Sequence, residues 1–366
     1  MSAKIAIVMC PAWSLETPPL SLGLLAGALK TKGRVVTQYH INLLSAMHVD
    51  YETHQELWAP TGHFLWTNDH SFEDKILPLY KDYWDTIIEE LSTFDIVTFT
   101  TYFSNVVVTD YIAERLYKKN PKLHIFYGGP YCWNAPHGGL RISHPLEEPN
   151  RYWIKVSCDT EGELIINDLV DCYENGETYE KVNGIWTWDK DGKPLSTGMR
   201  IPQKDLTVLP TANWDGVELQ NYKPFHYEGH AHLPLQGSRG CIAKCTFCAE
   251  TRIYRYKTAD ILVKEIIELE KKYKIKWNIL RFFNVYGPGQ DLSRTDQGIV
   301  SIFLDLIRNN NKIAIQGSLN RFRDLIYIDD IATILFEVIP FQDILWHLLW
   351  LVRWVHRYLP NHPQIH

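Results

Sequence analysis

Short apolar runs alternate with longer segments of helical spacing along the first half of this 366-residue chain. Runs typical of buried strands lie at residues 4–9, 35–41, 95–101, 124–127 and 152–156. Apolar positions spaced as on one face of a helix lie at residues 20–30, 75–91, 108–119 and 162–173. Strands that alternate with helices predict βαβ units and a parallel sheet. We therefore expect residues 1–175 to form an α/β, doubly wound, Rossmann-like domain, with an irregular insertion at 51–74.

The second half of the chain is less regular. Its first part is rich in turn residues and predicts a connector with one small hairpin. Residues 233–236 then predict a strand, and residues 258–273 predict a charged amphipathic helix. The pattern changes after residue 275, where we place a junction. The boundaries that we predict are 176–232 for the connector, 233–276 for an abbreviated second domain, 277–340 for a C-terminal α/β fragment and 341–366 for a tail.

The tail has an aromatic stripe. Trp346, Trp350 and Trp354 are spaced four residues apart, which places them on one face of a helix. We expect this face to dock onto the body of the protein or onto another chain. A helix lying on a membrane surface is the alternative, because His347 and Arg353 are interspersed among the apolar residues.

Composition narrows the class of protein. The hydrophobic fraction of 45% and the charged fraction of 22% are those of a globular chain, and the net charge of −6 gives no basic surface for nucleic acid. No run of apolar residues is long enough to span a bilayer, and no secretory signal is visible, so we expect a cytoplasmic protein that does not enter the membrane. The 13 Trp and 20 Tyr residues are numerous. We attribute most of them to core packing and a few to a broad planar cofactor.

Three of the seven cysteines crowd together in a C-x3-C-x2-C pattern, as Cys241, Cys245 and Cys248. Soft thiolates at this spacing suit three corners of a [4Fe–4S] cluster, whose fourth iron stays open for chemistry. A zinc site completed by His230 or His232 is one alternative, and inert thiols or a disulfide are another. The scattered cysteines are predicted to be buried apolar residues: Cys10, Cys132, Cys158 and Cys172.

The cysteine segment resembles the signature of the radical SAM family, including the aromatic Phe247 before the last cysteine. The resemblance implies a partial β/α barrel whose open iron chelates S-adenosylmethionine, with Phe247 at the SAM site. One electron from a donor such as flavodoxin or ferredoxin would then cleave SAM to a 5′-deoxyadenosyl radical. The family's glycine-rich SAM-binding strand is not identifiable in this chain.

The turn after the first predicted strand has no G-x-G-x-x-G loop, which argues against a dinucleotide. A Pro-rich loop leads instead into a P-P-L-x-L-G motif at residues 18–23. With Gly-Gly-Pro at 128–130 and Glu-Gly-Glu at 161–163, the segment resembles the cobalamin-binding domain of B12-dependent radical SAM enzymes. That resemblance implies a cobalamin site made of Pro18, Leu20, Gly23, Gly128, Gly129, Pro130, Glu161, Gly162 and Glu163. The absence of a D-x-H-x-x-G motif implies that no protein histidine ligates the corrin. A doubly wound domain with no ligand is the alternative.

Residues 277–338 resemble a different family, the NAD-dependent nucleotide-sugar epimerases and dehydratases. The matching stretches run from residue 280 to 290 and from 317 to 330. The resemblance implies that Asn284 and Arg323 face the diphosphate of a nucleotide sugar. The chain has no glycine-rich NAD loop, and no Tyr-x-x-x-Lys pair stands at the expected distance upstream of residue 280. The sequence therefore shows neither the cofactor loop nor the acid/base pair that reductase chemistry requires.

These patterns favour a B12-binding radical SAM enzyme that cleaves SAM reductively and transfers a methyl group to an unactivated carbon. Its substrate would be a small molecule or a peptide. No catalytic residue and no oligomeric state can be assigned from the sequence. The alternatives are an NAD-dependent nucleotide-sugar epimerase or dehydratase fragment and a catalytically inactive chimera.

Overall fold

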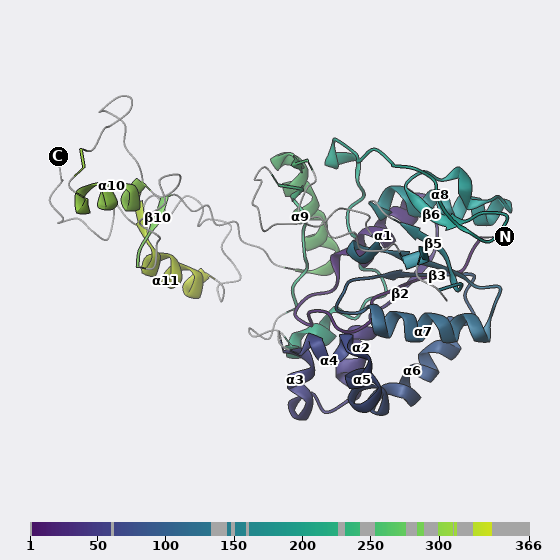
Figure 1. The fold of residues 1–366 in the computed structure, drawn as a ribbon. Coiled ribbons are helices and arrows are strands. Elements are labelled where there is room, and N and C mark those ends of the chain that lie inside the picture. The colour runs from purple at the N-terminus through teal and green to yellow at the C-terminus, as the bar shows by residue number, and fades with distance from the viewer. Residues whose placement is uncertain are drawn as a thin grey trace. The chain divides into compact units, whose positions relative to one another are not determined.

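The computed structural model (Figure 1) describes two units, residues 1–269 and 270–366, which are treated separately. Residues outside the description are 1, 60–61, 133–144, 148–150, 159–160, 226–230, 242–252, 276–283, 289–298, 310, 313–324 and 339–366. The finer domain boundaries expected from the sequence stay predictions. Among the described residues, no helix is long and apolar enough to cross a membrane. The aromatic stripe of the tail lies outside them.

The first unit is built on a seven-stranded sheet of order β2-β1-β3-β4-β5-β6-β7. Its parallel strands are β1 (Ile5–Val8), β2 (Val36–Tyr39), β3 (Ile96–Thr100), β4 (His124–Gly128) and β5 (Ile154–Cys158). All residues of β1 and β3 are buried, which is why both sequences are mostly apolar, with Thr98 and Thr100 as the polar residues of β3. The doubly wound α/β fold predicted from the alternating pattern is confirmed.

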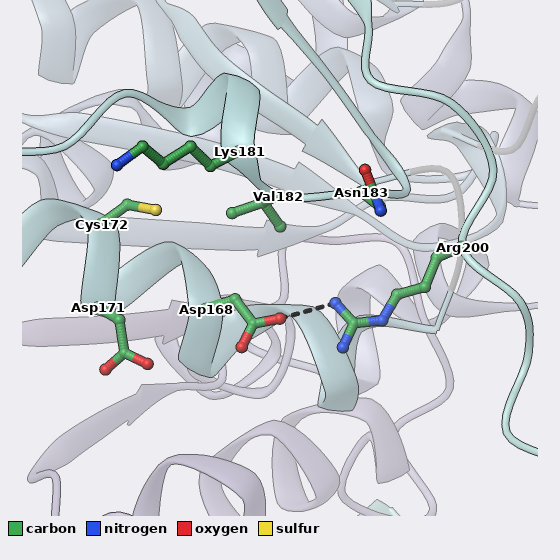
Figure 2. A pocket seen from close by; sticks show the side chains of 7 residues that line it. All are labelled: Asp168, Asp171, Cys172, Lys181, Val182, Asn183 and Arg200. Carbon is green, nitrogen blue, oxygen red and sulfur yellow. Dashed lines mark hydrogen bonds and ion pairs between the residues drawn. The ribbon is translucent and has the colours of Figure 1, made fainter.

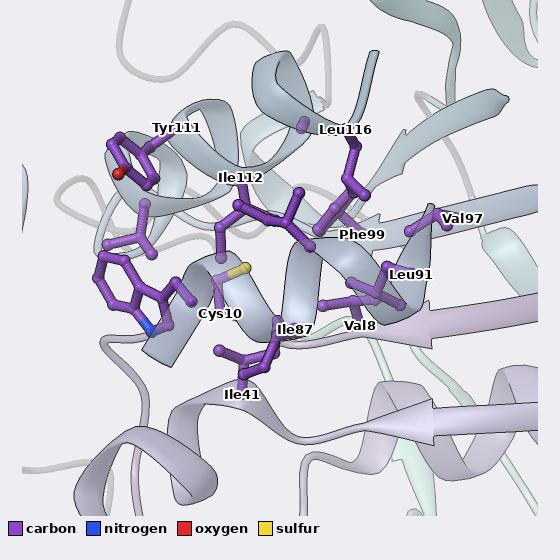
Figure 3. Close-up of a cluster of buried hydrophobic side chains, with 14 of the residues drawn as sticks. Val8, Cys10, Ile41, Ile87, Leu91, Val97, Phe99, Tyr111, Ile112 and Leu116 are labelled. Carbon is purple, nitrogen blue, oxygen red and sulfur yellow. The ribbon is translucent and has the colours of Figure 1, made fainter. Parts of the chain in front are cut away.

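Helices cover both faces of this sheet. On one face, α1 (Leu20–Thr31) and α8 (Gly162–Asn175) pack against Ile5 and Ile7. On the other, α6 (Leu77–Leu91) and α7 (Val106–Lys119) pack against Ala6 and Val8, in the cluster drawn in Figure 3. Because successive residues of a strand point to opposite faces, β1 contributes to both cores. The short helix α2 (Ile41–His48) follows β2.

The segment expected to be an irregular insertion is helical instead. It contains a 3₁₀ turn at Glu52–His54, the short helices α3 (Gln55–Trp58), α4 (His63–Thr67) and α5 (Asp69–Ser71), and a π-helical turn at Phe72–Ile76. Elements of three to five residues are too short to show a helical period, so the pattern could not predict them. Trp66 and Trp84 lie fully buried against Tyr80. The expectation that tryptophans serve core packing is confirmed here.

The connector contains the predicted hairpin, formed by β6 (Ile185–Trp188) and β7 (Pro194–Ser196). This hairpin extends the main sheet, since β6 pairs antiparallel with β5. Two 3₁₀ segments follow, at Leu206–Val208 and Leu219–Phe225, and another, at Tyr179–Lys181, precedes β6. The strand expected at 233–236 is wrong, because β8 (Ser238–Arg239) begins later and pairs with β9 (Arg255–Tyr256). The predicted amphipathic helix is α9 (Ala259–Tyr273).

The second unit has β10 (Asn284–Tyr286) and β11 (Leu325–Tyr327) as a parallel pair. Its described helices are α10 (Ile299–Arg308) and α11 (Ile328–Val338). These elements agree with the α/β fragment expected in this part of the chain.

Candidate functional site

The parallel sheet has a topological switch point between β1 and β3. The chain leaves β1 into α1 on one face and leaves β3 into α7 on the other, so the two following loops diverge. Ligands of doubly wound folds bind in the crevice at this point, outside the carboxyl ends of the strands. The loop after β1 is the Pro-rich segment 10–19. The carboxyl edge of the sheet is therefore the candidate site.

Buried amides join the loops that form this edge. The side-chain nitrogen of Asn105 donates to the carbonyl oxygens of Thr100, at 3.1 Å, and Cys10, at 3.4 Å. The side-chain oxygen of Asn105 accepts from the Tyr102 amide at 2.8 Å. In addition, the Ser104 hydroxyl donates to the carbonyl of Ala12 at 2.9 Å. Hydrogen bonds thus connect the loop after β1 to the loop after β3.

Partly exposed aromatic rings lie at this edge, and the sequence analysis did not assign them to the site. Trp13 lies against Tyr102, with ring centroids 4.2 Å apart and planes inclined by 31°. Phe103 is 53% exposed and meets Tyr131 edge-on at 5.2 Å. Flat, partly exposed rings of this kind suit packing against a broad planar ligand. Their signal in the sequence is their position in the segments that follow buried strands.

The Gly-Gly-Pro motif at residues 128–130 lies at the same edge of the sheet. The Gly128 carbonyl accepts hydrogen bonds from the amide and the hydroxyl of Thr101, both at 2.7 Å. Gly129 has a φ of +96°, and a Cβ there would lie 2.7 Å from the Thr101 carbonyl oxygen. Gly129 is therefore required for the close approach of two loops. Pro130 opens the 3₁₀ turn Pro130–Cys132.

The P-P-L-x-L-G motif at residues 18–23 contains the end of the loop after β1 and the start of α1. Pro18 is buried, and Leu20 is the first helical residue. A Cβ on Gly23 would lie 2.6 Å from the indole of Trp214, so this glycine makes room for the connector. A Cβ on Gly162 would lie 3.3 Å from the side chain of Leu25, so this glycine allows α8 to pack closely against α1. The structure thus brings the three predicted motifs to one edge of the sheet. It assigns a packing role to Gly23 and Gly162. Their contact with cobalamin stays a prediction.

The two glutamates of the Glu-Gly-Glu motif at residues 161–163 are bound to arginines on either side of the cysteine segment. Glu163 forms an ion pair with Arg239, and Glu161 binds Arg255 at 2.5 Å and Arg239 at 3.3 Å. All four side chains are less than 10% exposed. Burial raises the pKa of Glu161, but the hydrogen bond from Arg255 and the charge of Arg239 outweigh it and lower that pKa below its ordinary value. The carboxylate is therefore ionised at neutral pH.

The cysteine cluster is described only in part. Cys241 is exposed, whereas Cys245, Cys248 and Phe247 lie outside the described residues. Within the described segments, no group of three or more His, Cys, Asp or Glu side chains is placed to hold a metal ion. The zinc alternative is not tested, because His230 also lies outside the description.

The four scattered cysteines are buried, as predicted: Cys10, Cys132, Cys158 and Cys172. Burial raises the pKa of Cys10 to about 12 and that of Cys132 to about 11. Such thiols stay protonated at neutral pH and are poor metal ligands.

A cavity of about 510 Å³ lies elsewhere, along the C-terminal half of α8 (Figure 2). Its charged groups already have partners: Asp168 binds Arg200 at 2.7 Å, Asp171 binds Lys32 at 2.5 Å, and Lys181 binds Glu177 at 3.0 Å. It therefore offers no free charge to a ligand. In the second unit, Asn284 begins β10, while Arg323 lies outside the described residues.

Comparison with known proteins finds two kinds of relative. The sequence model of the NAD dependent epimerase/dehydratase family matches residues 250–343. The chain is 44% identical over 153 residues to a dTDP-L-rhamnose 4-epimerase of Burkholderia thailandensis, an alignment that covers 41% of this chain and 36% of that protein. It is 26% identical over 204 residues to an anaerobic magnesium-protoporphyrin IX monomethyl ester cyclase of Rubrivivax gelatinosus, covering 54% and 35% of the two chains. The chain thus spans about a third of the length of these curated relatives.

A solved structure supports the fold. The cobalamin-dependent S-adenosylmethionine radical enzyme OxsB, with aqua-cobalamin bound, superposes with a TM-score of 0.50 at 18% identity. The superposition covers 89% of this chain and 38% of that one. Both resemblances recognised in the sequence, to B12-dependent radical SAM enzymes and to the epimerase/dehydratase family, are confirmed.

Proposed function

We propose that this chain provides the cobalamin-binding domain and the cluster-binding segment of a B12-dependent radical SAM enzyme. The observation that supports this most is the ion pairing of the carboxyl edge with the cysteine segment. Arg239, which binds Glu161 and Glu163 at the start of α8, stands two residues before Cys241. The segment that would bind the cluster therefore begins beside the edge that would bind the corrin.

The residues at the edge fit a corrin. Trp13, Tyr102 and Phe103 offer flat apolar surface, and Gly129 lets the loops after β3 and β4 approach closely. The donor set fits an iron–sulfur cluster, since three thiolates leave one iron open for SAM. When bound, these groups supply a 5′-deoxyadenosyl radical and a carrier for a methyl group. The reaction that we propose is methyl transfer to an unactivated carbon of a small molecule or peptide, with flavodoxin or ferredoxin as electron donor.

Cluster binding is tested by anaerobic reconstitution of the full chain with iron and sulfide. We expect a broad charge-transfer absorption band that is lost when Cys241, Cys245 or Cys248 is changed to Ala. Cys172→Ala is the matched control, because that thiol is buried in α8, and it should leave the band unchanged. A wild-type chain without the band, or a band indifferent to the three substitutions, would disprove cluster binding. A reducing cytoplasmic compartment is part of the proposal, since it keeps these thiols available.

Cobalamin binding is tested by titrating the chain with hydroxocobalamin and following tryptophan fluorescence. We expect Trp13→Ala and Phe103→Ala to weaken binding about tenfold, because each removes apolar surface from the carboxyl edge. Tyr152→Ala is the control: this ring is 49% exposed but precedes β5, at the opposite edge of the sheet. Equal losses for all three variants would contradict a site at the carboxyl edge.

The epimerase match supports a second candidate, binding of a nucleotide sugar by the second unit through Asn284 and Arg323. Titration calorimetry with NAD and a UDP-sugar tests it. We expect no heat from NAD, because the chain lacks the glycine-rich loop through which backbone amides approach a pyrophosphate. Absence of heat from both ligands would remove this candidate.

A further inference from the structure

We propose that Glu161 is a positioning residue that holds closed the base of the Cys loop, defined as residues 240–254 between β8 and β9. The proposal rests on the proposed function, because the loop matters only if its cysteines bind a cluster. It concerns a carboxylate that the sequence assigned to the cobalamin site. The structure shows this carboxylate engaged with the cysteine segment.

The two strands that bracket the loop place like charges opposite each other. In the β8–β9 ladder, Ser238 pairs with Tyr256 and Arg239 pairs with Arg255. The amide of Lys257 extends the ladder by donating to the Gly237 carbonyl at 2.8 Å. Like charges directly opposite on antiparallel strands are destabilising. The last rung before the Cys loop therefore requires a counterion.

Glu161 is the counterion shared by both strands. Its Oε1 accepts from Arg255 at 2.5 Å and lies 3.3 Å from a guanidinium nitrogen of Arg239. Glu163 binds Arg239, and the Gln203 carbonyl accepts from Arg255 at 2.8 Å. Two carboxylates and two guanidiniums thus form a neutral buried set, in which only Glu161 connects the two strands among the described residues.

No other described acid near the ladder replaces it. Lys257 pairs at 2.5 Å with Glu265 of α9, and both side chains are at most 7% exposed. That pair is neutral by itself, and Lys257 lies two residue pairs beyond the like-charged pair in the ladder. Removing the charge of Glu161 would leave one uncompensated positive charge buried between β8 and β9, a change that strongly destabilises buried ion pairs.

Hydrogen exchange of the full chain without cluster tests the proposal through Glu161→Gln. We expect exchange in peptides covering 237–241 and 253–258 to become at least about tenfold faster, with β1 and β3 unchanged. Asp110→Asn is the matched control. Asp110 lies on α7, which covers the opposite face of the sheet from α8, and the substitution breaks its 2.7 Å ion pair with Arg151. Unchanged exchange at the ladder, or equal acceleration throughout the sheet, would overturn the proposal.

A second variant tests the charge argument. Adding Arg255→Met to Glu161→Gln removes one of the two opposed charges while keeping a long side chain. We expect the double variant to regain ladder protection to within about threefold of the wild-type rate. A double variant as open as Glu161→Gln alone would overturn the like-charge account.

The reconstituted protein gives a readout of position. In Glu161→Gln we expect several-fold faster iron loss and an altered EPR spectrum of the reduced cluster, neither of which should change in Asp110→Asn. An unaltered EPR spectrum and rate of iron loss would overturn the positioning role. A wild-type chain that binds no iron would instead disprove the proposed function, while the exchange experiment would still decide whether Glu161 closes the loop.

Discussion

Gly23 shows how the absence of one side chain positions the connector. A Cβ at this residue would lie 2.6 Å from the indole of Trp214, which is itself fully buried. Gly23→Ala should therefore force α1 and the connector apart and lower the free energy of unfolding of the first unit by about 1–3 kcal/mol. Denaturant unfolding followed by tryptophan fluorescence measures the change.

Ser21→Ala provides the control on the same helix. The Ser21 hydroxyl is buried without a hydrogen-bond partner among the described residues. Its removal should be neutral or slightly stabilising, because an unsatisfied polar group disappears. If Gly23→Ala were as harmless as Ser21→Ala, the contact with Trp214 would not constrain the connector.

His40 predicts sensitivity to acid. The ring is buried, is hydrogen-bonded to the Tyr222 hydroxyl, and has its pKa lowered by burial to about 4. The unfolded chain, with a histidine pKa of about 6.5, binds the proton first, so stability falls as pH drops from about 6.5 towards 4. The loss from this one group amounts to roughly 3 kcal/mol at most.

Unfolding free energies measured between pH 7 and pH 4.5 test this prediction. His40→Gln should make their pH dependence shallower without abolishing it, because burial also lowers the pKa of His124 to about 4. An identical slope in the variant and the wild type would show that His40 does not contribute.

At the scale of elements, Asn105 couples the loops after β1 and β3. Asn105→Ala would leave the buried carbonyls of Thr100 and Cys10 and the Tyr102 amide without these partners. We expect a loss of at least about 2 kcal/mol in unfolding free energy and weaker cobalamin binding. Thermal unfolding and the hydroxocobalamin titration measure the two effects.

Asn120→Ala separates stability from binding. Asn120 also donates to a backbone carbonyl, that of Ser92 at 3.0 Å, but it follows α7 at the opposite edge of the sheet. This variant should lose stability and keep its cobalamin affinity. Reduced affinity in both variants would indicate that Asn105 acts only through overall stability.

Local pattern predicted the elements that carry their own signal. Both faces of the strand β3 are buried, and it was predicted from the mostly apolar run at residues 95–101. The short helices α3 to α5 have no period to detect, and the addition of β6 to the sheet depends on a partner strand far away in the chain. The same holds at the candidate site. The Glu161–Arg255 pair spans 94 residues, and nothing local indicates it.

At the scale of the whole molecule, the two units differ in how much core they bury. The first has a seven-stranded sheet with a hydrophobic cluster on each face. The described part of the second has a two-stranded parallel pair, and several of its apolar side chains are 40–59% exposed: Leu304, Ile307, Leu325 and Ile328. A two-stranded pair is at best marginally stable in water unless more structure packs on it. We therefore expect the second unit to unfold more readily than the first.

Limited proteolysis of the full chain tests both the lower stability of the second unit and the ion pairing of Glu161 with Arg239 and Arg255. If Glu161 holds β8 and β9 against α8, the resistant fragment should extend through β9 and end near residue 270, because the ladder is then part of the first unit. A fragment ending near residue 230 would mean that the cysteine segment is not held, which favours the inactive chimera. Glu161→Gln should shift the cut from the first position towards the second, whereas Asp110→Asn should not. Mass spectrometry of the fragments distinguishes these outcomes, and a resistant fragment reaching residue 340 would contradict the expected weakness of the second unit.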